Sequence, residues 1–172
     1  NELSQLYYFE LEEIPAQEAE DVTVSSTKIR NALLKGKVQK ANVLLGYNYL
    51  LSGKVIHSAQ LGRKIGFPTA NIQINNERKL IPADGVYAVK VTVDNKKCYG
   101  MLNIGVKPTT ENNSHQIEVH IFDFSEQIYG QEIYVKLVKR IRDEKKFKDL
   151  KTLQHQLQKD ENNCKKFFKI VR

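Results

Sequence analysis

The stretch GVYAVKVTVDNKKCYGMLNIGV (85–106) decides the fold class, because it contains two extended runs joined by a turn. DNKK (94–97) supplies the turn residues, and KCYGMLNIGV (97–106) follows as the partner strand. The first run is apolar at Val86, Ala88, Val91 and Val93. The sequence therefore predicts a β-hairpin in the middle of the chain.

Two stretches beyond the hairpin show the alternation of a strand. In HQIEVHIFDF (115–124), one face carries Ile117, Val119 and Ile121. The other face carries Glu118, His120, Phe122 and Phe124. EIYVKLVKRI (132–141) alternates again through Ile133, Val135 and Leu137. With two further strands expected near 50–57 and 69–75, the chain is predicted to be mainly β, with about six strands spaced as in a small barrel.

Two short helices are predicted before the strands. The first is expected to begin at one of the hydroxyl residues 25–27 and to end at Gly36. The second is expected to run from Val38 to Gly46. Because two short helices form a poor core alone, we interpret this segment as an appendage or the remainder of a larger unit.

An amphipathic helical zone is predicted after the strands, with apolar residues at three-, four- or seven-residue steps except for a polar turn near Asp160. Its apolar positions are Phe147, Leu150, Leu153, Leu157, Cys164 and Phe168. A helix in this place is expected to pack across the side of the barrel or to plug one end.

The chain of 172 residues is basic, with a formal net charge of +7. Residues 1–27 carry only acidic charges, so the basic charge is concentrated in the remainder. A basic surface attracts nucleic acid or phosphorylated small molecules, or it is simply solvated. The sequence shows neither a membrane span nor a signal-peptide pattern, and Cys98 and Cys164 lack the spacing of zinc ligands. These features favour a cytoplasmic protein with reduced thiols.

LGRKIGFPTANI (61–72) is a candidate phosphate-binding stretch, although it is not a Walker A sequence. Gly62 and Gly66 permit close approach of the backbone, and Arg63 and Lys64 supply positive charge between them. An ordinary glycine turn that enters a strand is the simpler alternative.

The end of the same stretch is a candidate metal site. Pro68 stiffens the exit, and Thr69 and Asn71 lie two apart in extended chain, so their side chains are expected on one face. A hydroxyl and an amide oxygen side by side suit a hard cation such as Mg²⁺.

Glu118 is a candidate general base, because its carboxylate lies on the polar face of a largely apolar strand. A solvent-facing glutamate is the alternative, and His120 on the same face is interpreted as structural. NIGVKPTT (103–110) reads as a functional loop in which Gly105 and Pro108 flank a lysine, with a long hairpin connection as the alternative.

Taken together, these stretches resemble the riboflavin kinase module of bacterial bifunctional riboflavin kinase/FMN adenylyltransferases. The resemblance is carried by GKVIHSAQLGRKIGFPTANI (53–72), GVYAV (85–89), NIGVKPT (103–109), EVHIFDF (118–124) and YGQEIYV (129–135). It implies a six-stranded Greek-key barrel that transfers the γ-phosphoryl group of ATP to the ribityl 5′-hydroxyl of riboflavin, giving FMN.

The resemblance also implies roles for individual residues. Thr69 and Asn71 match the positions that bind Mg²⁺ and nucleotide phosphates, and Glu118 matches the position of the catalytic base. The nucleotide is expected to contact Gly62, Arg63, Lys64, Gly66, Pro68, Thr69 and Asn71. The flavin is expected to contact Asn103, Gly105, Lys107, Pro108 and Thr109.

The resemblance divides the chain into two parts. Residues 48–172 match the kinase domain, whereas VSSTKIRNALLKGKVQKANVLLG (24–46) resembles the end of an adenylyltransferase domain, so we assign residues 1–47 to that remnant and a linker. The chain begins with Asn1 and contains no HxGH element, so FMN adenylylation is not expected from it, and any missing part of a longer native protein lies upstream. Ser58 and Lys107 depart from the glycine and arginine usual in the family.

Two rival functions stay open at this point. A non-catalytic module that binds flavin or nucleotide is disfavoured by the presence of Glu118, Thr69 and Asn71. A nucleic-acid-binding barrel is disfavoured because Tyr99, Tyr134 and Phe122 do not form an aromatic row. The expected partners are therefore riboflavin and ATP, without nucleic acid or membrane, in a monomer or weak oligomer.

Overall fold

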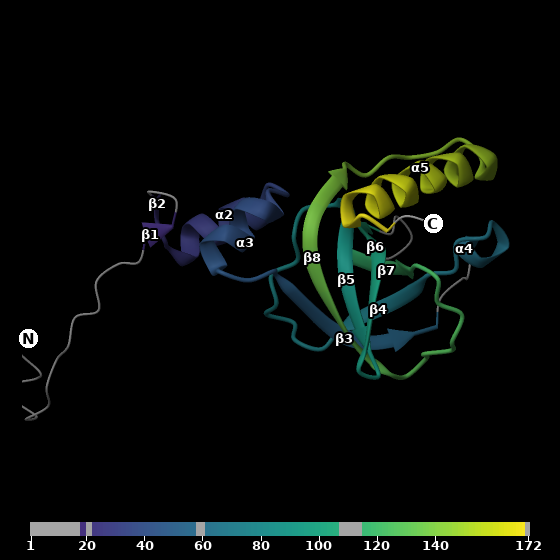
Figure 1. Ribbon diagram of the computed structural model, residues 1–172, viewed down its shortest axis with the longest axis horizontal. Helices are drawn as coiled ribbons and strands as arrows, with labels where there is room; N and C mark the ends of the chain where they lie inside the picture. Colours follow the sequence, from purple (N-terminus) through teal and green to yellow (C-terminus); the bar gives the residue numbers. More distant parts are fainter. Residues whose placement is uncertain (1–17, 20–21, 58–60, 107–114, 171–172) are drawn as a thin grey trace, which may run out of the picture.

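The computed structural model describes residues 18–19, 22–57, 61–106 and 115–170, and it forms a closed antiparallel barrel of six strands (Figure 1). The strands are β3 (Leu50–Ile56), β4 (Ala70–Ile74), β5 (Gly85–Val93), β6 (Lys96–Val106), β7 (His115–Ile121) and β8 (Glu132–Arg142). Around the barrel they follow the order β3-β4-β7-β6-β5-β8, which is a Greek-key arrangement. The predicted fold class is confirmed.

The β5–β6 hairpin that decided the fold class has a two-residue turn. Val93 pairs with Lys96, and the turn residues Asp94 and Asn95 both adopt positive φ, at 46° and 62°. Positive φ at both central residues gives the turn the twist of the flanking strands, and Asp and Asn tolerate this conformation well. The turn therefore fixes the register of a nine-pair ladder that ends at Gly85 and Ile104.

The inward faces of the strands form the main core. Tyr87, Leu102, Ile133 and Leu137 are fully buried there, together with the predicted inward face of β7. The prediction is wrong for Phe124, which packs against this same core instead of lying on the outer face. The reason is that β7 ends at Ile121, and Asp123 then adopts a positive φ of 54° that turns the chain.

The short helices α2 (Ser26–Leu34) and α3 (Val38–Leu45) follow a small ribbon of β1 (Glu18–Ala19) and β2 (Val22–Thr23). Leu33, Val38 and Ala41 belong to the same buried cluster as the barrel interior. Asn42 of α3 ties the helix to the barrel, because its Nδ2 donates to the Leu137 carbonyl oxygen at 2.9 Å. The helices thus share the barrel core, and the division between residues 47 and 48 stays a prediction.

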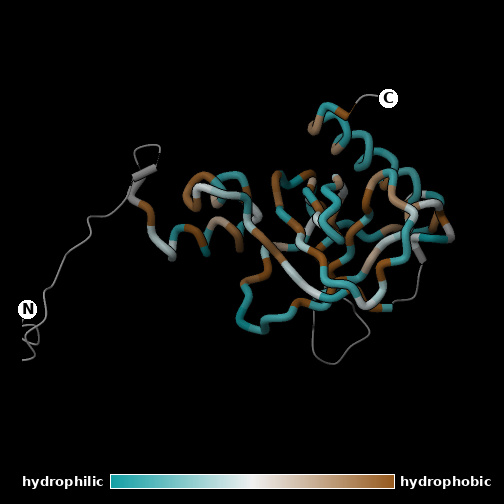
Figure 2. Tube along the Cα trace, turned by 60° about the horizontal axis from the view of Figure 1, so that its bottom comes forward, coloured by the Kyte–Doolittle hydropathy of each residue, from teal (hydrophilic) through white to brown (hydrophobic). Residues whose placement is uncertain are grey.

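Helix α5 (Leu150–Phe168) lies across the outside of the barrel (Figure 1). Figure 2 shows it near the C-terminus as a mostly hydrophilic tube with single hydrophobic residues. Those residues cover a second apolar cluster, which contains Phe67, Val86, Ala88, Met101, Phe122 and Cys164. The helix runs without a break through the polar turn noted near Asp160. Asp160 itself is buried, with 1% of its surface exposed.

Two further observations complete the fold. No helix among the described residues is long and apolar enough to cross a membrane. Cys98 and Cys164 are both free thiols, and burial raises the pKa of Cys164 to about 12. The buried thiol is therefore protonated and unreactive at neutral pH.

Candidate functional site

Two cavities meet at Thr69, which lines both of them. The first, here called the α5 cavity, measures about 360 Å³ and lies between the outer face of β6–β7 and helix α5. The second, here called the Tyr129 cavity, measures about 370 Å³ and lies between the start of β4 and residues 124–129. Each volume lies within the range of small-molecule sites.

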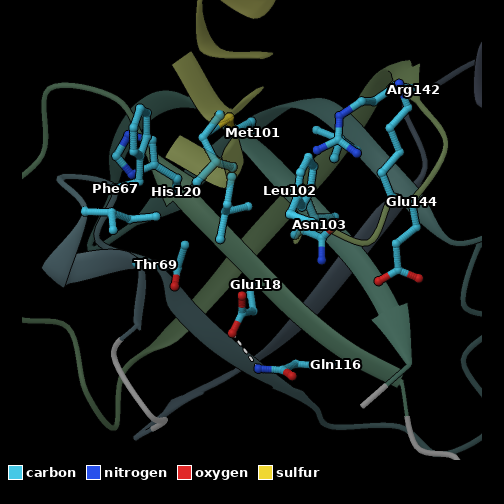
Figure 3. A pocket seen from close by; sticks show the side chains of 17 residues that line it. Phe67, Thr69, Met101, Leu102, Asn103, Gln116, Glu118, His120, Arg142 and Glu144 are labelled. Carbon is cyan, nitrogen blue, oxygen red and sulfur yellow. Dashed lines mark hydrogen bonds between the residues drawn. The ribbon is translucent and has the colours of Figure 1, made fainter. Parts of the chain in front are cut away.

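The α5 cavity has an apolar wall and a polar floor. The apolar wall is made of Ile65, Phe67, Met101, Phe147, Leu153 and Leu157. The polar groups are Thr69, Asn103, Gln116, Glu118, His120, Arg142, Glu144 and Lys145. Figure 3 shows the Thr69 hydroxyl and the Glu118 carboxylate near each other at the lower side, with Glu144 at the opposite end. A ligand with a flat apolar body and a hydroxylated tail matches this division.

Glu118 is held in a triangle of hydrogen bonds with Asn71 and Gln116. The Asn71 Nδ2 donates to Glu118 Oε1 at 3.0 Å. The Gln116 Nε2 donates to the same oxygen at 2.5 Å (Figure 3). The Gln116 Nε2 also donates to Asn71 Oδ1 at 2.9 Å. The triangle forms because Asn71 of β4 lies opposite Glu118 of β7 in the register. Glu118 is therefore not the solvated glutamate of the alternative interpretation.

His120 connects the same face of β7 to the segment PTAN (68–71). Its Nδ1 lies 2.7 Å from the Pro68 carbonyl oxygen, and its ring meets Phe67 edge to face. Since a carbonyl can only accept, the imidazole donates from Nδ1. His120 thereby anchors the backbone just before Thr69, in agreement with the structural role predicted for it.

The glycine-rich stretch forms a short helical turn, α4 (Leu61–Lys64), and not an open loop. A Cβ on Gly62 would collide with the Phe67 carbonyl oxygen, and Gly66 adopts a positive φ of 81°. Both glycines are thus required by the backbone, as predicted. Arg63 lines the Tyr129 cavity, whereas the side chain of Lys64 lies outside the described residues.

The predicted flavin-binding residues are only partly placed. Asn103 lines the α5 cavity opposite Glu118 in the β6–β7 register. Gly105 does not line it; a Cβ there would collide with the Glu144 carboxylate, so this glycine makes room for Glu144. Lys107, Pro108, Thr109 and Ser58 lie outside the described residues.

Sequence reasoning missed several residues of the α5 cavity. Arg142 is held by Asp160 of α5, whose carboxylate accepts from Nε at 2.9 Å and lies 2.8 Å from Nη2. Burial, followed by the charge of Asp84, raises the pKa of Glu144. Only Gln116 had a usable signal, since the alternation of β7 places it on the face of Glu118.

The donor set fits a hard cation. The described residues contain no group of three or more His, Cys, Asp or Glu side chains arranged to hold a metal. The α5 cavity offers the side-chain oxygens of Thr69 and Glu118, whereas Asn71 is 6% exposed, lines neither of the two cavities and lies directly behind Glu118. Mg²⁺ is often bound by few protein oxygens and is completed by water and substrate phosphates, so this set suits it.

Comparisons with known proteins agree with this geometry. Residues 45–168 match the family model described as "Flavokinase: Riboflavin kinase". The chain is 46% identical over 156 residues to the bifunctional riboflavin kinase/FMN adenylyltransferase of Bacillus subtilis (strain 168), covering 89% of this chain and 49% of that protein. The protein of the same name from Listeria monocytogenes is 45% identical over 161 residues, covering 93% of this chain and 51% of that protein. The chain thus spans about half the length of the curated relatives that it matches.

A solved structure shares the fold. The crystal structure titled as a macrolide-efflux protein from Streptococcus pneumoniae superimposes with a TM-score of 0.81 and 41% sequence identity. The match covers 87% of this chain and 49% of that one.

Proposed function

Because the chain belongs to the riboflavin kinase family, we propose that it phosphorylates riboflavin at the ribityl 5′-hydroxyl with ATP, giving FMN and ADP. The observation that supports this most is Thr69, which lines two cavities at once and lies beside Glu118. Transfer of a phosphoryl group needs two bound substrates that meet at one point, with charge neutralisation and a base there.

The position of Glu118 supports an assignment of the two cavities. The base has to reach the hydroxyl that attacks, and Glu118 lines the α5 cavity, so riboflavin is assigned to that cavity. The apolar wall suits the isoalloxazine ring, and the polar floor suits the ribityl chain. ATP is then assigned to the Tyr129 cavity, where Arg63 and Pro68 line the wall. Gly62 and Gly66, also predicted from the sequence to contact the nucleotide, shape the backbone between the α5 cavity and the Tyr129 cavity.

The proposed reaction is an in-line displacement. The 5′-oxygen of riboflavin forms a bond to the γ-phosphorus of ATP, the bond from that phosphorus to the β–γ bridging oxygen breaks, and ADP leaves. Glu118 accepts the proton of the 5′-hydroxyl. Thr69 and Asn71 would hold a Mg²⁺ ion, which would neutralise charge on the phosphates. Arg63 adds positive charge at the nucleotide side.

The finer sequence predictions stay with this proposal. We assign the protein to the cytoplasm, as a monomer or weak oligomer that acts on small molecules without nucleic acid. The two free thiols support a reducing compartment. The absence of an HxGH element from the sequence keeps FMN adenylylation outside the proposal.

The experiment combines turnover with binding. Purified protein, riboflavin, ATP and Mg²⁺ are incubated, and FMN is separated and quantified by its fluorescence. FMN formation is the expected result. Riboflavin binding without any FMN would contradict the catalytic proposal and would favour the rival, a module that only binds flavin or nucleotide.

A further inference from the structure

Gln116 touches both residues on which the proposed reaction depends, and we propose that it is a positioning residue for Asn71 and Glu118. The inference rests on the proposed riboflavin kinase function. The Gln116 Nε2 donates to Asn71 Oδ1 at 2.9 Å and to Glu118 Oε1 at 2.5 Å. The side chain lines the α5 cavity and is half-buried.

The first consequence concerns the orientation of the Asn71 amide. Asn71 is 6% exposed, and its Nδ2 donates to Glu118 Oε1 at 3.0 Å. If the amide turned over, Asn71 Oδ1 would face the carboxylate oxygen, and its NH₂ group would face that of Gln116. The Glu118 carboxylate can only accept and the Gln116 Nε2 can only donate, so both select the same orientation of the Asn71 amide. The oxygen proposed to bind Mg²⁺ is therefore directed by Gln116 together with Glu118.

Residues that hydrogen-bond to a metal ligand orient it and tune its affinity, and their loss commonly weakens metal binding. Gln116 has this relation to Asn71, which makes its removal visible in nucleotide binding that depends on Mg²⁺.

The second consequence concerns Glu118. Both side-chain amides donate their hydrogen bonds to Oε1 of Glu118. We therefore assign Oε2 as the oxygen that accepts the proton of the hydroxyl. Hydrogen bonds to a carboxylate are stronger than neutral ones, and two of them fix the plane of the group. A base held in this way is positioned before riboflavin binds, and small displacements of such a base are costly in rate.

The test compares Gln116→Leu with Gln73→Leu. Leucine keeps the bulk of glutamine without its donors, and Gln73 lies exposed on β4 two residues from Asn71. For Gln116→Leu we expect kcat to fall ~10-fold and the affinity for Mg²⁺·ADP in calorimetry to fall ~10-fold. Affinity for ADP with chelator and the melting temperature should change little, and Gln73→Leu should match the wild type in all four measurements.

A second variant covers the case in which leucine perturbs the cavity. Gln116→Met keeps the unbranched shape of glutamine and also lacks its N–H donors. We expect Gln116→Met to lose kcat and Mg²⁺·ADP affinity as Gln116→Leu does. A loss in Gln116→Leu that is absent from Gln116→Met would assign the effect to packing and overturn the positioning role.

The outcomes separate the two levels of the argument. Wild-type kcat and Mg²⁺·ADP affinity in Gln116→Leu would overturn the inference, as would a loss of melting temperature alone. If the wild type forms no FMN but Gln116→Leu still loses Mg²⁺·ADP affinity, the proposed function fails, whereas the positioning of Asn71 stands. If the wild type forms FMN and neither variant differs from it, only the positioning role fails.

Discussion

The two faces of strand β7 differ in what their residues contact. Ile117, Val119 and Ile121 point inward and are buried in the barrel core. The side chains that alternate with them, Gln116, Glu118 and His120, lie on the outward face. All three contact the segment that contains Pro68 and Asn71. The inward face thus packs in the barrel core, whereas the outward face hydrogen-bonds to β4 and the segment before it at the candidate site.

This difference teaches how a single strand can separate stability from chemistry. A change on the inward face should alter the free energy of unfolding and leave the rate per folded molecule intact. A change at Gln116 or Glu118 on the outward face should do the reverse, since these two side chains are half-buried and hydrogen-bonded to each other. Two variants on β7 test this separation directly. Two more, at other residues that line the α5 cavity, test how far it extends beyond β7.

The largest effect is expected for Glu118→Gln, the loss of the proposed base. General acid–base catalysis contributes ~100-fold or more, so kcat should fall by at least that factor while the melting temperature changes little. Riboflavin phosphorylation is measured by FMN formation. Glu132→Gln, at the exposed first position of β8, is the matched control and should be fully active. A Glu118→Gln enzyme with most of its rate would remove the base from the mechanism.

The next effect is expected on the inward face, for Ile117→Ala. Ile117 is 4% exposed, and truncation of such a side chain costs ~2–5 kcal/mol in the free energy of unfolding. Urea denaturation measures that loss. The rate per folded molecule should stay near that of the wild type, and a fall in kcat comparable to the fall in stability would show that the two faces are coupled.

A moderate effect is expected for Thr69→Ala, because Thr69 joins the two cavities. Loss of its hydroxyl should raise the KM for Mg²⁺·ATP by ~10-fold, the order of one hydrogen bond to a charged group. Riboflavin binding, followed by quenching of its fluorescence, should be largely kept. Weaker riboflavin binding with an unchanged KM for ATP would reverse the assignment of the cavities.

The smallest effect is expected for Glu144→Gln at the far end of the α5 cavity. Burial raises the pKa of Glu144, so the folded protein binds this proton more tightly than the unfolded chain does. Stability is therefore lost as the pH rises from the ordinary glutamate range through the raised pKa. Glu144→Gln should melt slightly higher than the wild type at neutral pH, and the difference should vanish in acid. A variant that melts lower at neutral pH would contradict this sign.

The strands could be predicted from sequence because alternation reports burial directly. The period of two in residues 115–121 follows from the inward face of the barrel, and it also placed Glu118 on the outer face. It failed at Phe124, since Asp123 leaves the extended conformation and nothing in the pattern marks that turn.

The site was harder to predict because its residues depend on partners distant in sequence. Asp160 belongs to a polar turn in the sequence, but the structure buries it, and Arg142 of β8 compensates that burial with a paired charge. Gln116 was not among the predicted site residues, because its contact with Asn71 at 2.9 Å depends on the β4–β7 register. Gly62 was recognisable since close backbone approach leaves a signal in the residue type itself.

The closure of the barrel has a consequence for how the chain folds. Strand β3 pairs with β8 through residues 50–54 and 132–136. The β3–β8 ladder therefore cannot form until residues 132–136 are available. Contacts so distant in sequence slow folding, and during synthesis the edges of β3 and β5 stay open until β8 leaves the ribosome. Open edges can pair with other chains and seed aggregation. The last strand is therefore the one that protects the nascent barrel from its neighbours.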